Sequence, residues 1–96
     1  MSLNNEDTDR LLRCRAEING LNARLLDLLE ARGRLVESIA ELKRHHRIEI
    51  HDPDRENAML AAVLARTTGP FSDDQVARVF RCIFDVSREL ASREGG

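Results

Sequence analysis

The stretch that decides the fold is residues 11–42, LLRCRAEINGLNARLLDLLEARGRLVESIAEL. Its apolar residues recur at alternating steps of three and four, at Leu11, Cys14, Ile18, Leu21, Leu25, Leu28, Leu35, Ile39 and Leu42. This spacing lines up an apolar seam on one face of a helix. With Asp7 or Thr8 as the cap, we expect one long helix over about residues 8–46.

The length of this helix favours a dimer. A helix over residues 8–46 would extend roughly 58 Å at about 1.5 Å per residue. A compact globule of 96 residues has a diameter of only roughly 32 Å. The apolar seam must therefore reach beyond any core that one chain can build, and it needs a cover. We expect that cover to be a second copy, in a homodimer.

A second, shorter helix is expected over about residues 53–66. Asp52 is suited to cap it, and Pro53 suits the first helical position. Residues 58–65 are apolar nearly all round the helix, which is typical of a buried helix.

A third helix is expected over about residues 73–93, with fraying at residues 94–96. Ser72 and Gln75 have the spacing of a capping box, and Phe71 can pack on Val76 as a hydrophobic staple. No alternation long enough for a sheet is present. The sequence therefore predicts an all-α fold with one long and two short helices per chain, forming a single domain over residues 1–96.

Composition excludes several classes of protein. The chain is 42% apolar and 33% charged, which is typical neither of a disordered nor of a membrane protein. A net charge of −2, with three Phe, no Tyr and no Trp, argues against nucleic-acid binding. The longest apolar run, residues 58–65, falls short of the roughly 20 residues that cross a membrane.

The cysteines and the N-terminus predict a cytoplasmic protein. Cys14 and Cys82 each fall in an apolar helical pattern, so we expect buried free thiols rather than a disulfide or a metal site. Residues 1–9 are polar and acidic and do not resemble a signal peptide. His45, His46 and His51 lack a third or fourth ligand at suitable spacing, and we expect no metal.

Arg32 stands in the seam where a leucine is expected. An unpaired guanidinium there would be costly, so it either forms an intersubunit salt bridge, snorkels to solvent or belongs to an anion site. Lys43 returns to nearly the same face about 16 Å further on. Arg15 lies on another face, roughly 25 Å away, and could serve a partner's pocket in an antiparallel dimer. Taken alone, Lys43 and Arg15 are better explained as ordinary surface charge.

Other polar residues interrupt the shorter helices. Asp52, Arg55 and Glu56 share one face, either as a capped first turn with a local ion pair or as a polar lip that binds a hydroxyl and a carboxylate. Ser87 interrupts an apolar stripe, and its hydroxyl can simply bond back to a helix carbonyl. No nucleophile–base pair is visible. Several cations and few acids suit a small polyanion and a reaction governed by positioning and electrostatics.

Several of these residues also carry a family likeness. Residues 12–22, residues 25–32, Lys43 and residues 52–56 together resemble the all-helical chorismate mutases, the AroQ class. Residues 68–72 and 80–84 look most like the mutase domain fused to some bacterial 3-deoxy-arabino-heptulosonate 7-phosphate (DAHP) synthases. The likeness covers about residues 10–92.

The resemblance implies an intertwined homodimer of three-helix chains with two shared active sites. It implies an isomerase of aromatic amino acid biosynthesis in the shikimate pathway, which rearranges chorismate to prephenate without a cofactor. A DAHP synthase is a further expected partner. The site would hold chorismate in a compact diaxial conformer, while cations stabilise charge on the ether oxygen.

Residue roles follow from the resemblance by matching position. Arg32, and Arg15 from the other subunit, would bind the substrate carboxylates, and Lys43 would contact the enolpyruvyl carboxylate and the ether oxygen. Arg55 would line the pocket, with Asp52 and Glu56 near the ring hydroxyl, and Ser87 would hold the ring carboxylate. Lys43, Arg32 and Glu56 are the expected catalytic residues.

Ala91 departs from the family pattern. The family usually has Gln or Glu there, a second donor to the ether oxygen, and losing such a donor can cost roughly 10²–10³ in rate. Three interpretations stay open: a chorismate mutase that is weak alone, a related enzyme such as isochorismate–pyruvate lyase or 4-amino-4-deoxychorismate mutase, and a non-catalytic subunit that binds chorismate or prephenate.

Overall fold

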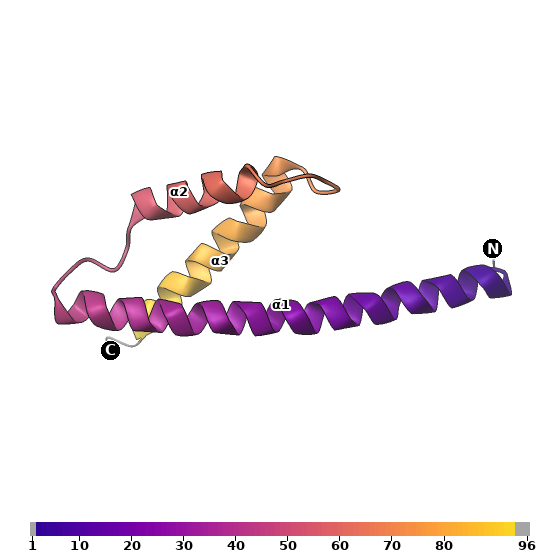
Figure 1. Cartoon of the computed structure of the whole chain (residues 1–96), viewed down its shortest axis with the longest axis horizontal. Coiled ribbons are helices and arrows are strands. Elements are labelled where there is room, and N and C mark those ends of the chain that lie inside the picture. Colours follow the sequence, from indigo (N-terminus) through magenta and orange to yellow (C-terminus); the bar gives the residue numbers. More distant parts are fainter. Residues whose placement is uncertain (1, 94–96) are drawn as a thin grey trace. The chain divides into compact units, whose positions relative to one another are not determined.

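The computed structural model describes residues 2–93 and contains three helices (Figure 1). They are α1 (Asn5–His45), α2 (Pro53–Leu64) and α3 (Asp73–Arg93), and no strand occurs among the described residues. The predicted all-α class with one long and two short helices is confirmed. The fraying expected at residues 94–96 lies outside the described range.

The start of α1 corrects one expectation. The cap is Asn4 rather than Asp7 or Thr8, because the Asn4 Oδ1 atom accepts a hydrogen bond from the Asp7 backbone N–H at 2.7 Å. Asparagine caps a helix as well as aspartate does. The earlier start also places Glu6 and Asp7 in the first turn, where negative charge is favourable.

The starts of the two short helices agree with the sequence. Asp52 caps α2 by accepting the Arg55 backbone N–H at 3.1 Å, and Pro53 is the first helical residue. At α3 the capping box is reciprocal. The Gln75 backbone N–H donates to the Ser72 hydroxyl at 3.1 Å, and the Ser72 backbone N–H donates to the Gln75 side-chain oxygen at 3.0 Å.

The chain divides into two units, one ending at Arg32 and one beginning at Gly33. The described part of the first unit is the N-terminal portion of α1. Its residues from Ser2 to Ala31 are all exposed, including eight large apolar side chains of the helix: Leu11, Leu12, Ile18, Leu21, Leu25, Leu26, Leu28 and Leu29. This unit therefore has no core of its own.

The second unit holds the described core. Helices α2 and α3 pack against each other, and the buried apolar residues are Ala40, Ala77, Phe84 and Ala91. Gly33 lies close to α3, because a Cβ atom added there would stand 3.4 Å from the Leu90 Cδ2 atom. Three alanines and one phenylalanine make a small core, as is usual where one short chain buries little surface.

Two burial expectations are wrong for the single chain. No residue of α2 is buried, and both Cys14 and Cys82 are exposed free thiols. The physical reason is the small core, which cannot enclose the apolar sides of three helices. None of the helices in residues 2–93 combines the length and the hydropathy that a membrane crossing requires.

We predict opposite effects of alanine at two glycines. Gly33→Ala should raise the free energy of unfolding by roughly 0.5–1 kcal/mol, because alanine is the better helix former and the Leu90 side chain leaves room for its methyl group. Gly69→Ala should lower stability, because Gly69 has a φ of +87°, where an L side chain is strained. Urea unfolding measures both. A loss of stability in Gly33→Ala would mean that the contact with Leu90 outweighs helix propensity.

Candidate active site

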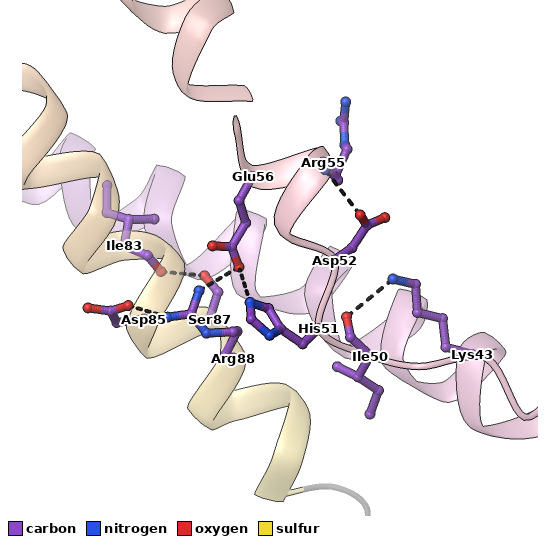
Figure 2. A network of polar contacts seen from close by, with 10 residues as sticks. All are labelled: Lys43, Ile50, His51, Asp52, Arg55, Glu56, Ile83, Asp85, Ser87 and Arg88. Carbon is purple, nitrogen blue, oxygen red and sulfur yellow. Dashed lines mark hydrogen bonds and ion pairs between the residues drawn. The ribbon is translucent and has the colours of Figure 1, made fainter. Parts of the chain in front are cut away.

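A polar contact between α2 and α3 joins Glu56 to Arg88 (Figure 2). The Arg88 Nη1 atom donates a hydrogen bond to the Glu56 Oε2 atom at 2.5 Å. Both side chains are partly enclosed, with exposed fractions of 22% for Glu56 and 33% for Arg88. A charge-assisted bond in such surroundings is stronger than one on an open surface.

Two further groups adjoin this pair. Arg88 also donates through its Nη2 atom to Asp85, one turn earlier on α3. The hydrogen bond to Glu56, supported by Asp85, raises the pKa of Arg88, so its guanidinium stays charged. The His51 Nε2 atom lies 3.9 Å from the Glu56 Oε2 atom. The Arg88 and His51 contacts therefore fall on the same carboxylate oxygen, and Oε1 takes part in neither.

Lys43 lies near the end of α1 and is half-buried. Its Nζ atom donates a hydrogen bond to the Ile50 carbonyl at 3.2 Å, across the loop that leads into α2 (Figure 2). One carbonyl satisfies one of the three ammonium donors. The contact holds the lysine close to the start of α2, beside the loop that carries His51 and Asp52.

Asp52 and Arg55 meet through the cap of α2. The bond runs from the Arg55 backbone N–H to the Asp52 carboxylate, while the Arg55 side chain is exposed. The capped first turn of α2, one of the two interpretations of the sequence, is therefore present. The local ion pair is different from the one expected, because Glu56 pairs with Arg88 of α3 rather than within its own turn.

Ser87 and Ala91 show local roles on α3. The Ser87 hydroxyl donates to the Ile83 carbonyl one turn earlier at 2.6 Å, as the simpler interpretation of the sequence predicted. Ala91 is only 3% exposed, and its carbonyl accepts a hydrogen bond from the Arg44 Nη1 atom at 3.1 Å. Position 91 thus belongs to the small core of the second unit.

Arg15 and Arg32 belong to the first unit. Arg15 is exposed and Arg32 is half-buried. The candidate residues from Lys43 to Ala91 belong to the second unit, where Glu56 pairs with Arg88 and lies 3.9 Å from His51. No set of three or more His, Cys, Asp or Glu side chains within residues 2–93 is arranged to hold a metal ion.

An apolar hollow of about 390 Å³ lies elsewhere in the second unit, at the start of α3. Phe71, Val76, Val79 and Phe80 line it together with Gln75 and Arg78. The two members of the expected staple, Phe71 and Val76, thus border one hollow. None of the candidate site residues lines it.

Comparison with known proteins identifies the family. Residues 14–92 match the chorismate mutase type II family. The chain belongs to that family. The resemblance drawn from the sequence is therefore confirmed.

Relatives and solved structures agree with this membership. Two chorismate mutase structures from Thermus thermophilus are each 38% identical. Form II covers 88% of this chain and 96% of its own with a TM-score of 0.86, and form I covers 81% and 98% with a TM-score of 0.80.

The curated relatives are longer proteins. Bifunctional chorismate mutase/prephenate dehydratases of Stutzerimonas stutzeri and Pseudomonas aeruginosa are 29% and 31% identical over 80 residues, which is 78% of this chain. The matched part is 22% of each relative's length. The fusion partner in their names is a prephenate dehydratase, whereas the resemblance had suggested a DAHP synthase.

Within this member of the chorismate mutase family, sequence reasoning missed Arg88. The residue follows Ser87 directly and stands three residues after Asp85, and no sequence pattern singles it out. The signal that was available is its position beside a candidate site residue. Its pairing with Glu56, 32 residues earlier, is a tertiary contact that no local pattern encodes.

Proposed function

We propose that this chain is a chorismate mutase, which converts chorismate to prephenate. Its membership of the chorismate mutase type II family over residues 14–92 carries this proposal. The form II likeness supports it, because it is 38% identical and extends over 88% of the chain. The reaction is an intramolecular rearrangement in which one carbon–oxygen bond breaks and one carbon–carbon bond forms, and no proton or group leaves the molecule.

The residues present suit such a reaction. A dicarboxylate that must adopt a compact conformer needs cations that grip both of its ends. We propose that Arg32 and the partner subunit's Arg15 bind the carboxylates of the substrate. Lys43 contacts the enolpyruvyl carboxylate and the ether oxygen, where negative charge develops as the bond breaks.

The remaining roles fall on the second unit. Arg55 lines the pocket, Asp52 and Glu56 face the ring hydroxyl, and Ser87 binds the ring carboxylate. A serine hydroxyl can accept hydrogen bonds as well as donate one, and that of Ser87 donates to the Ile83 carbonyl. Because these groups lie on α2 and α3, which pack together, the ring end of the substrate meets a surface organised by tertiary contacts.

We propose that the active protein is a homodimer with shared sites. The support is the exposed row of leucines on residues 11–29, which is larger than the scattered apolar residues of a stable monomer surface. A second copy would cover this row and bring Arg15 to a site that its own chain does not complete. We place the protein in the cytoplasm, where two free cysteines stay reduced. A DAHP synthase partner stays a prediction.

Product identification tests the function against its alternatives. Purified protein is incubated with chorismate and with isochorismate, and the products are separated by chromatography. Prephenate from chorismate supports the proposal, whereas pyruvate with salicylate from isochorismate would assign a lyase. Binding of chorismate without any product would assign a regulatory subunit. This function is the second candidate because Ala91 stands where the family usually has a donor.

Arg32→Ala should lower turnover of chorismate by roughly 10³-fold or more, because a carboxylate loses its charged partner. Arg34→Ala is the matched control, an exposed arginine two positions further along α1. Initial rates and size-exclusion chromatography measure activity and dimerisation. Normal turnover in Arg32→Ala would remove Arg32 from the site.

Mixing two inactive variants tests the shared site. Arg15→Ala and Lys43→Ala each disable both sites of their own homodimer. In a heterodimer one site loses both groups and the other keeps both, so an equal mixture should recover about a quarter of wild-type activity. The rate is measured after subunit exchange has been confirmed by mass spectrometry. No recovery would place Arg15 and Lys43 in a site built from one chain.

Ala91→Gln should raise turnover by roughly tenfold or more if a donor to the ether oxygen is missing. Because Ala91 is buried, Ala91→Met is the control, with similar bulk and no donor. A gain in kcat for Gln over Met, with equal thermal stability, isolates the donor. Equal rates in both variants would mean that another group already supplies this contact.

A further inference from the structure

The Glu56–Arg88 pair changes what the site can recognise. The carboxylate of Glu56 is held by the Arg88 Nη1 atom at 2.5 Å through Oε2, and His51 lies 3.9 Å from the same oxygen. Neither the contact with Arg88 nor the contact with His51 involves the Glu56 Oε1 atom. One carboxylate oxygen of Glu56, the residue that we assign to the ring hydroxyl, is therefore bound to a cation, and this cation lies in the surroundings of the group that meets the ring substituent.

We propose that Arg88 is a specificity-determining positioning residue, which makes Glu56 select an uncharged ring hydroxyl over a positively charged ring amino group. This inference rests on the proposed function, since it concerns the ring end of the same site. The two substrates that it separates are chorismate and 4-amino-4-deoxychorismate, which differ at that one ring position.

The combined charge of the pair decides which ring substituent is preferred. A lone carboxylate accepts a hydrogen bond from a hydroxyl but attracts an ammonium group more strongly, because the second interaction is between full charges. A guanidinium bonded to the carboxylate cancels most of that attraction and repels a second cation. The ring hydroxyl still finds a carboxylate oxygen that accepts its hydrogen bond, whereas a ring ammonium group is no longer attracted more strongly than the hydroxyl.

The neighbouring charges leave this conclusion in place. Asp85 bonds to the other amino group of Arg88 and is 63% exposed, so solvent screens it. The Asp52 carboxylate accepts the cap hydrogen bond of α2 and keeps its negative charge in every Arg88 variant, so its attraction for an ammonium group is the same on both sides of the comparison. His51 adds positive charge when protonated, which also disfavours an ammonium group beside Glu56. Lys43, at the other end of the loop, carries a positive charge, as a protonated His51 does.

The experiment compares the kcat/KM values for chorismate and for 4-amino-4-deoxychorismate. Arg88→Met keeps the length of the side chain and removes its charge, and it should shift the ratio toward the amino substrate by roughly ten- to a hundredfold. Arg88→Lys restores a cation and should return the ratio toward the wild-type value. Arg78→Met is the matched control on α3, since Arg78 pairs only with Asp74 among the ion pairs of the described residues.

Circular dichroism and thermal unfolding establish that each variant is folded. A ratio that is unchanged in Arg88→Met, or changed equally in Arg78→Met, would overturn the inference. If Arg88→Met does not fold, Asp85→Asn and Arg88→Lys carry the test, and Arg88→Lys must then keep the preference for chorismate. A wild-type protein that turns over neither compound refutes the proposed function alone. In that case the ratio of the two dissociation constants, measured by calorimetry, still tests Arg88.

Discussion

The constraint on which the molecule depends is that 96 residues cannot cover the apolar side of a 41-residue helix. The first unit consists of helix with exposed leucines, and the second unit buries only three alanines and one phenylalanine. Burial of apolar surface is the main source of folding free energy, so a chain with so small a core gains much from association. The proposed homodimer answers this need, and the proposed shared active site follows from the same arrangement.

The polar chemistry of the second unit is organised by tertiary contacts rather than by any one helix. Lys43 is held to the loop before α2, Asp52 caps that helix, and Glu56 reaches across to α3. Each contact uses a backbone group or a full charge and leaves further donors or acceptors on the same side chain. Such an arrangement suits catalysis by positioning and charge, because it fixes orientation without consuming the groups that meet the substrate.

Local signals predicted the helices well. The bounds of α3 are those expected, and the caps at Asp52 and Ser72 were readable because capping depends on residues three apart in sequence. The start of α1 was predicted three residues late, since Asn4 competes equally well with Asp7 as a cap. Burial was predicted poorly. The apolar pattern around Cys82 shows which side of a helix is apolar, but not whether one chain can enclose it.

The sequence by itself determined the three helices, the caps of α2 and α3, and the family, because periodicity and capping are local and the family match rests on residue identity in order. It also named the cations and acids of the candidate site. Only the tertiary structure decided that Glu56 pairs with Arg88, that Ala91 is buried and that Lys43 bonds to Ile50. The physical reason is that helix packing, which brings side chains from different helices together, depends on the shapes of whole helix faces and not on spacing along the chain.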